Sequence, residues 1–465
     1  MTDAARAVTA STLPAPAAPR DATLPAPVER VLDNGLHVVA FTQRNLPLIA
    51  AQLVVRGGSS AEHEDEAGLS ALVAVLLTQG TAVRSATELA AASDALGARL
   101  DAGSGFDASL MSVSATTPAF PYAFALLDEV VRRPAFAPRE VERVRTKSIS
   151  DLALGYASPA VLARLVAQRV AYAGSPYGHP VAGTVTTLPA LSRDRVAWFH
   201  ERFYRPDDAV LVIGGDLEID DAFALADRVL GSWRAPGRAL DAPLDAAIPP
   251  PRTRVVIVDK PDAGRTALVV GRVSIARGSP DYYAATVAAA VLHGYSGRLN
   301  QEIRVKRGLS YGAGASVSAR RMPGLFSAST LIDHTRAVEA TDVTLAAIRS
   351  LVDAPASDED LVSRKATVTG GFHRSIETID GITGSLAEHA LYGVPLAELS
   401  EYTRRVQAVD AAAVRDFAAR GFVPDDFIVL VGDASQFAGD FAGRYADVRV
   451  IPSTQLDLSS PTLGG

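Results

Sequence analysis

An internal repeat constrains the fold of this chain more than any other feature of its sequence. Residues 199–217 are FHERFYRPDDAVLVIGGDL, and residues 417–435 are FAARGFVPDDFIVLVGDAS. Phe199 and Phe417 are 218 positions apart (417 − 199), and so are Pro206 and Pro424 (424 − 206). Each copy predicts a helix, a Pro-Asp-Asp turn and then a buried strand, over 209–214 and 427–432. A unit that occurs twice predicts two similar domains.

Strands and amphipathic helices recur in a similar order around the two copies. We expect strands at 36–42, 49–56 and 111–115, with counterparts at 254–259, 266–273 and 325–331. In the first half we expect helices at 66–77, 86–96, 119–132, 138–153 and 159–171. The mixture predicts two similar α+β domains.

Proline-rich stretches predict the domain boundaries. Residues 1–29 are rich in Ala, Pro and Thr, which favours a flexible N-terminal segment. The stretch 235–252 contains Pro249-Pro250-Pro251, which is typical of a linker. We therefore expect an N-terminal domain over 30–234 and a C-terminal domain over 253–465.

Composition excludes several classes of protein. The net charge is −7 and the 45 Lys and Arg residues are scattered, so nothing favours nucleic-acid binding. No apolar run reaches the roughly 18 residues of a membrane-spanning helix. The sequence has no cysteine, which excludes disulfides, zinc fingers and thiol catalysis. We expect a soluble protein, cytoplasmic because no signal peptide is evident, or periplasmic if such a signal has been removed.

Residues 67–81, AGLSALVAVLLTQGT, resemble the active-site helix of the pitrilysin/insulinase-type (inverzincin) zinc metallopeptidases, whose form is close to AGLxHxxEHxxxxGT. Aligned without a gap, the first zinc histidine falls on Ala71, the catalytic glutamate on Ala74 and the second histidine on Val75. The family motif works because two imidazoles four residues apart share a helical face, with the glutamate beside them as general base. Alanine and valine offer no lone pair for zinc and no proton acceptor. We therefore expect this chain to bind no metal at these positions.

The resemblance to this family extends over nearly the whole chain in collinear motifs. It implies two α/β-roll domains, each an antiparallel-rich sheet packed by helices, that close as a clamshell. The matching segments are 32–36 (LDNGL), 56–59 (RGGS), 175–184 (SPYGHPVAGT), 296–299 (SGRL) and 304–311 (RVKRGLSY). The family's third zinc ligand is a glutamate on a later helix, and that position falls at or beside Asp151. None of the 8 histidines has the spacing of a zinc-binding pair, and we expect His179 and His200 to be structural.

The second half keeps one set of functional positions, Arg304 and Tyr311. In the R-x-x-x-G-L-x-Y context, the resemblance implies that this pair grips the substrate backbone and stabilises the oxyanion at a zinc site. A chain with this pair but without the metal ligands is expected to act as the zinc-free subunit of a heterodimeric zinc endopeptidase, inactive alone. A homologous partner with an intact H-x-x-E-H motif would hold the zinc, and the substrates would be peptides.

One alternative is a catalytically inert structural or substrate-recognition subunit of a related assembly. Recognition subunits of the processing peptidases carry a long glycine-rich loop. The matching stretch here, 292–297 (LHGYSG), is short and has two glycines, which weighs against that role. A further alternative is an enzyme with a different site of its own. The sequence contains no nucleophile elbow or phosphate loop that would support it, and 312–314 (GAG) is no dinucleotide fingerprint.

Overall fold

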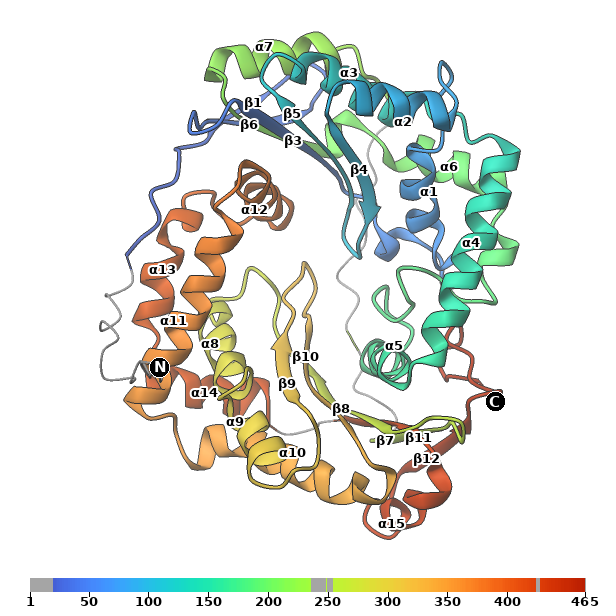
Figure 1. Ribbon diagram of the computed structural model, residues 1–465, viewed down its shortest axis with the longest axis vertical. Coiled ribbons are helices and arrows are strands. Elements are labelled where there is room, and N and C mark those ends of the chain that lie inside the picture. The colour runs from blue at the N-terminus through green and yellow to red at the C-terminus, as the bar shows by residue number, and fades with distance from the viewer. Residues whose placement is uncertain (1–19, 236–247, 249–253, 424–426, 465) are drawn as a thin grey trace, which may run out of the picture.

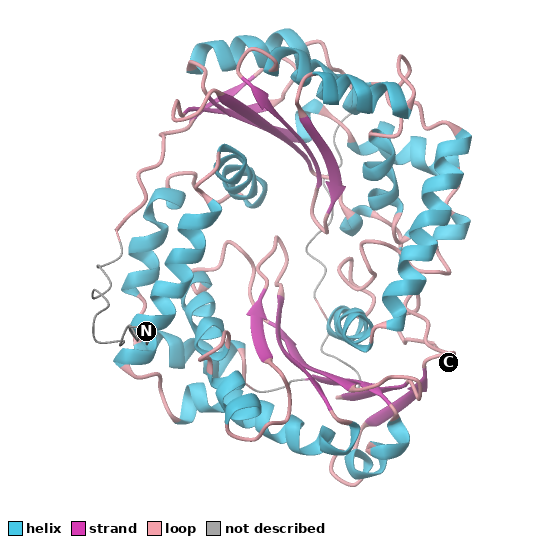
Figure 2. Ribbon diagram, in the orientation of Figure 1, coloured by secondary structure: helices cyan, strands magenta, loops and turns pink. Residues whose placement is uncertain are grey.

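A computed structural model describes residues 20–235, 248, 254–423 and 427–464. The chain forms two α+β halves whose sheets face each other around the centre of the molecule (Figures 1 and 2). This confirms the predicted fold class. Most of the predicted N-terminal segment 1–29, most of the linker 235–252 and the Pro-Asp-Asp turn of the second repeat lie outside the described residues.

Each half contains one six-stranded mixed sheet. The N-terminal sheet has the order β1-β2-β6-β3-β5-β4, and the C-terminal sheet has the order β12-β7-β11-β8-β10-β9. The N-terminal strands are β1 (Val28–Val31), β2 (His37–Thr42), β3 (Leu48–Val55), β4 (Arg99–Ser104), β5 (Ser109–Thr116) and β6 (Ala209–Gly215). The C-terminal strands are β7 (Val255–Asp259), β8 (Thr266–Val273), β9 (Ala313–Val317), β10 (Leu325–Ile332), β11 (Phe427–Gly432) and β12 (Val448–Pro452).

The two sheets repeat the same topology over five of their strands. The central strands β3 and β8 begin 218 residues apart (48 and 266), as do β6 and β11 (209 and 427). The outermost strand on one side differs, because β1 precedes β2 and runs antiparallel to it, whereas β12 comes from the C-terminal end and runs parallel to β7. Among the described residues, the first strand, β1, begins at Val28, two residues before the expected start of the first domain.

Helices cover the outer face of each sheet. In Figure 1, α3 and α7 lie along the N-terminal sheet, and α10 lies along the C-terminal sheet. The helices of the first half are α1 (Leu69–Leu77), α2 (Ala86–Ala95), α3 (Phe120–Arg132), α4 (Pro138–Ala157), α5 (Pro159–Tyr172), α6 (Arg193–Phe203) and α7 (Ile219–Leu230). Those of the second half are α8 (Tyr282–Leu292), α9 (Arg298–Asn300), α10 (Ala337–Asp353), α11 (Asp358–Ser375), α12 (Ile379–Tyr392), α13 (Glu398–Ala408), α14 (Ala411–Gly421) and α15 (Ala438–Ala442).

The halves exchange one helix each across the centre of the molecule. Helix α5 of the first half packs on the inner face of the C-terminal sheet, and α12 of the second half packs on the inner face of the N-terminal sheet (Figure 1). Leu162, Val166 and Tyr172 of α5 are buried against β7, β8 and β11. Because burial of each large apolar side chain contributes about 1.5–3 kcal/mol, the two exchanged helices hold the halves together.

Two consecutive helices, α4 and α5, together have the length and apolar composition of a membrane span. No single helix among the described residues has the length and apolar composition to cross a membrane, whereas α4 and α5 taken together do, with a bend of 101° between them. Much of α5 is buried in the protein core, so the core packing already accounts for its apolar character.

Candidate functional site

Helix α1 carries the three positions that align with the family's zinc motif. It begins at Leu69 rather than at 66, because Gly68 has a left-handed φ of +98° and residues Glu64–Glu66 form a separate 3-10 turn. Gly68 has no side chain to cap the helix, and the carboxylate of Glu62 takes over that task. It accepts hydrogen bonds from the backbone N–H groups of Gly68 (2.9 Å) and Ser70 (2.6 Å).

The side chains at the aligned positions do not fit zinc. Ala74 is 0% exposed within the core of the first half, Ala71 is half-buried, and Val75 is 42% exposed. None of the three has a nitrogen or oxygen atom in its side chain that could bind a metal or accept a proton. Packing therefore fills the space around Ala74 that a catalytic glutamate would need.

The third ligand position is also without a suitable carboxylate. Asp151 lies on the exposed side of α4, where its carboxylate pairs with Lys147 at 2.5 Å. Its neighbour Leu152 packs against the core that includes α1. The carboxylate at 151 is therefore a solvated surface group, and the helix presents leucine towards the first half's core.

The histidines singled out in the sequence have structural contacts. His179 Nε2 lies 2.9 Å from the carbonyl oxygen of Ser59 and 3.4 Å from the carboxylate of Glu62, so it braces the loop that leads into α1. His200 Nε2 lies 2.7 Å from the carbonyl oxygen of Val131. Within the described ranges, no group of three or more His, Asp or Glu side chains is arranged to hold a metal ion.

Arg304 lies in a π-helical turn, Gln301–Val305, that follows α9. Such turns are rare and are frequent at functional sites. The guanidinium group of Arg304 stacks on the ring of Tyr295, 4.8 Å from its centroid. Glu302 on the same turn pairs with Lys306 and with Arg307, both at 2.5 Å, and the hydrogen bond from Lys306 lowers the pKa of Glu302. No carboxylate in the described part of the chain pairs with Arg304, so its charge is available to a ligand.

Tyr311 is the most exposed large side chain of this region, at 81% of its surface. Its ring lies 5.0 Å from the guanidinium carbon of Arg265, which itself pairs with Asp333 at 3.6 Å. The side chains of Ala267 and Val269 pack on the inner face of the C-terminal sheet against α5. Arg265 lies two and four residues before them, so it is placed on the same face. The phenol ring of Tyr311 therefore lies beside an inner-face residue, with its hydroxyl open to solvent.

The residues between Arg304 and Tyr311 explain the spacing of the motif. Gly308 adopts a left-handed φ of +59°, which permits the turn that ends the helix. Leu309 is buried, and its backbone N–H donates to the carbonyl oxygen of Ile303 at 2.8 Å. Leu309 thus anchors the segment in the core, while the arginine and the tyrosine on either side stay outside.

A buried asparagine joins these two parts of the motif. The side chain of Asn300 donates to the carbonyl oxygen of Tyr295 at 2.6 Å and accepts from the backbone N–H of Ala313 at 3.4 Å. It therefore ties the loop under Arg304 to the start of β9, two residues after Tyr311. We refer to Arg265, Tyr295, Asn300, Arg304 and Tyr311 as the β9 corner.

Sequence reasoning missed three members of the β9 corner. Arg265 directly precedes β8, and its stacking on Tyr311 depends on how β8, β10 and β9 pair. Tyr295 belongs to the short loop 292–297, which the sequence singled out only for its few glycines. The one signal that could have found Tyr295 is an exposed aromatic residue close to a functional arginine.

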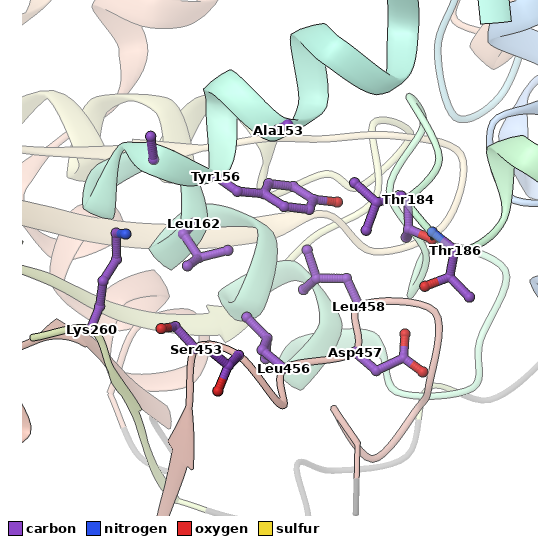
Figure 3. Close-up of a pocket in the computed structure, with 13 residues that line it drawn as sticks. Ala153, Tyr156, Leu162, Thr184, Thr186, Lys260, Ser453, Leu456, Asp457 and Leu458 are labelled. Atoms are coloured by element: carbon purple, nitrogen blue, oxygen red, sulfur yellow. The ribbon is translucent and has the colours of Figure 1, made fainter. Parts of the chain in front are cut away.

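A separate cavity of about 340 Å³ lies where α4 and α5 meet the C-terminal end of the chain (Figure 3). The hydroxyl of Tyr156 points towards Thr184 in this view, and burial raises its pKa to about 12. The charged groups at the wall are engaged, because Lys260 pairs with Asp262 at 3.0 Å and Asp457 accepts from the backbone N–H of Ser459 at 2.8 Å. We assign no catalytic role to this cavity.

Two family descriptions match consecutive parts of the chain. The description "Insulinase (Peptidase family M16)" matches residues 38–185, and "Peptidase M16 inactive domain" matches residues 190–368. Together the two matches cover more than half of the chain. The chain belongs to the M16 peptidase family. The M16 relatives include an uncharacterized zinc protease of Mycobacterium leprae, 28% identical over 64% of this chain and 69% of that protein. Another, from Bacillus subtilis, is 20% identical over 86% of this chain and 96% of its own length.

Solved structures show the same M16 fold. A peptidase M16 inactive domain from Pseudomonas fluorescens superimposes with a TM-score of 0.80 at 23% identity, over 88% of this chain and 98% of that one. A protease from Helicobacter pylori gives a TM-score of 0.79 at 18% identity, over 88% of this chain and 100% of that one.

Proposed function

We propose that this M16 chain is the zinc-free subunit of a two-chain zinc peptidase and supplies Arg304 and Tyr311 to a site whose metal is held by a homologous partner. The observation that carries the proposal is that the β9 corner leaves the charge of Arg304 and the hydroxyl of Tyr311 available to a ligand. Arg304 and Tyr311 project from a segment that Leu309 anchors in the core. The positions for a metal in the same chain hold alanine and valine.

The two side chains suit the binding of a peptide whose carbonyl group is attacked by water. The guanidinium of Arg304 is permanently charged and donates in a plane, which fits carbonyl or carboxylate oxygens of a substrate. The exposed hydroxyl of Tyr311 can donate one directed hydrogen bond to an oxygen on which negative charge develops. In the partner, a zinc ion would polarise the scissile carbonyl and lower the pKa of the attacking water.

The stacking contacts prepare the pair for this role. Arg265 lies over the ring of Tyr311, and Tyr295 lies under the guanidinium of Arg304. Cation–π contacts at exposed sites contribute about 0.5–1 kcal/mol each, enough to favour one orientation of a side chain without burying its polar end. Orientation before binding lowers the entropy that a substrate or a transition state must supply.

Zinc-protease relatives support the reaction class. Several similar proteins are named zinc proteases, and hydrolysis of peptides is the activity that such names imply. A partner chain with an intact H-x-x-E-H helix would complete the catalytic set that this chain lacks.

The test is a two-chain reconstitution. This chain is expressed together with an H-x-x-E-H-bearing M16 chain from the same organism, and cleavage of a fluorogenic peptide is measured. We expect Arg304→Ala or Tyr311→Phe to lower the cleavage rate by about 10²–10³, the usual loss for one oxyanion donor. Arg307→Ala and Tyr122→Phe are matched controls, because Arg307 is paired with Glu302 and Tyr122 is an exposed tyrosine on α3.

A catalytically inert subunit predicts a different result. If the mixed enzyme cleaves peptides at the same rate with Tyr311→Phe and with Tyr122→Phe, the β9 corner plays no part in catalysis. The chain would then serve as a structural or recognition subunit.

A further inference from the structure

A cavity of about 380 Å³ lies where the two halves meet, at the opposite end of β9 from Tyr311. The first half contributes the loop after β3 and the turn before β6, and the second half contributes the β9–β10 hairpin and the end of α12. Four arginines line it: Arg56, Arg202, Arg205 and Arg321. This concentration of cations contrasts with the net charge of −7 for the whole chain.

Two of the four arginines are balanced by carboxylates of the first half. Arg205 is buried and forms two hydrogen bonds with Asp207, at 3.0 and 2.9 Å. Arg56 pairs with Asp208 at 3.4 Å. Arg56, Arg205 and Asp208 line the cavity, and within each of the two ion pairs the charges balance.

The remaining carboxylate of the cavity wall is already engaged in holding the halves together. Asp107 accepts a hydrogen bond from the hydroxyl of Tyr177 and one from the backbone N–H of Arg321 at 3.4 Å. Next to it, the guanidinium of Arg320 stacks on the ring of Phe106, 4.0 Å from the centroid. The hairpin of the second half is therefore fixed against the first half at this point.

Two guanidinium groups remain without a carboxylate partner. Arg202 comes from the first half and Arg321 from the second, and neither forms an ion pair with an Asp or Glu in the described part of the chain. Arg321 is still close enough to Asp208 for its charge to oppose the rise that burial causes in the pKa of that carboxyl. Arg202 is half-buried and Arg321 is exposed, so their like charges repel each other weakly across a cavity that water enters. An anion between them would remove that repulsion.

We propose that this cavity binds a small oxyanion, a phosphate or a carboxylate group, that bridges Arg202 and Arg321. Guanidinium groups are suited to this ligand, because their planar donors match two oxygens of a phosphate or carboxylate. The cavity is larger than one inorganic phosphate ion, so the oxyanion can be part of a larger molecule. Since its two arginines belong to different halves, the bound anion strengthens the contact between the halves. The proposal is independent of the role of the β9 corner.

Calorimetric titration of the full chain tests the proposal. The probes are inorganic phosphate, an N-acetylated dipeptide with a free C-terminal carboxylate, and the same dipeptide amidated, with sodium chloride at matched ionic strength as the blank. We expect saturable binding of phosphate, of the free-carboxylate dipeptide or of both, and none of the amidated dipeptide. Binding of phosphate alone identifies the ligand as a phosphate compound, and preference for the dipeptide identifies it as a peptide C-terminus.

Variants assign the site. Arg202→Gln and Arg321→Gln should each weaken the binding by about tenfold, the usual effect of losing one charge-assisted hydrogen bond. Arg415→Gln is the control, because Arg415 is an exposed arginine that pairs with Asp416 away from the cavity. Circular dichroism of each variant shows that the fold is kept. The proposal is overturned if no probe binds beyond the chloride blank, or if both variants bind as the native chain does.

Discussion

On helix α1, Ala71, Ala74 and Val75 occupy the positions that the sequence alignment assigns to two zinc histidines and a glutamate, and Ala74 is buried in the core. At the β9 corner, Arg304 is half-buried and Tyr311 is exposed, and their side chains stack on Tyr295 and Arg265. The side chains of the first region have no polar atoms, and that of Ala74 is packed in the core. In the second region, the guanidinium group of Arg304 and the hydroxyl of Tyr311 do not contribute to the packing of the core.

This difference separates residues that serve the fold from residues that serve a ligand. Ala74 contributes to stability because it fills the core, whereas Tyr311 is 81% exposed and buries too little surface to stabilise the fold. Exposure alone is not a sign of function, because Tyr122 is also exposed, but Tyr311 in addition lies beside Arg265 and shares its motif with Arg304. Binding to a partner or substrate would account for this arrangement, since tyrosine and arginine dominate the energetics of many interfaces.

The largest expected effect tests the burial of Ala74 on α1. Ala74→Glu should lower the free energy of unfolding by about 3 kcal/mol or more, because it places an unpaired carboxylate in the core. Val75→Glu, one residue further on the exposed side of the same helix, should change it by less than about 0.5 kcal/mol. Urea unfolding followed by circular dichroism measures both. Equal stabilities of the two variants would show that the core around Ala74 is open.

The next effect tests the β9 corner. Arg265→Ala should lower peptide cleavage by the two-chain enzyme about two- to fivefold, because Tyr311 loses the cation that orients its ring. The loss should appear in kcat, while the free energy of unfolding stays within about 0.5 kcal/mol of the native value. Arg265→Lys should recover part of the rate, since it keeps the cation. A structural role alone predicts equal rates for the alanine and lysine variants.

A smaller effect depends on pH and concerns two buried histidines, one in each half. Burial lowers the pKa of His200 on α6, which packs against α1, and burial likewise lowers the pKa of His389 on α12. Burial disfavours the charged form of both rings in the folded state, so their contribution to stability is present above the unfolded pKa of about 6.5 and is lost as the pH falls below it. Each contributes at most about 1.4 kcal/mol per pH unit in that range.

His200→Gln should therefore reduce the loss of stability between pH 7 and pH 5.5 without abolishing it, because His389 remains. Urea unfolding at several pH values measures the slope. A slope that the substitution leaves unchanged would exclude His200 as its source.

The smallest effect concerns the carboxylate nearest to the third ligand position. Asp151→Asn should change neither the stability nor the zinc content of the chain, because Asp151 is exposed and only Lys147 pairs with it. Elemental analysis after dialysis measures the metal. A fall in bound zinc on this substitution would show that Asp151 belongs to a metal site.

Much of the fold could be predicted because the sequence pattern is local. The expected strands 209–214, 266–273 and 427–432 agree with β6, β8 and β11 to within one residue, since each is a buried apolar run. The edge strands β4 (RLDAGS) and β9 (AGASV) were missed, because small and polar residues dominate them. Their pairing comes from the neighbouring strands β5 and β10.

The exchange of α5 and α12 could not be predicted from local pattern. Both helices have apolar faces, and nothing in their spacing says that each covers the sheet of the other half. The site shows the same limit. The motif R-x-x-x-G-L-x-Y predicted Arg304 and Tyr311, whereas Arg265 and Asn300 take their places through contacts between separate elements.

The most direct test of the account is peptide hydrolysis by this chain with and without an H-x-x-E-H-bearing M16 partner, each in the presence and absence of a metal chelator. We predict no hydrolysis by the purified chain alone, and chelator-sensitive hydrolysis when the partner is added. Chelator-sensitive hydrolysis by the purified chain alone would contradict the account, because it would place the metal in this chain.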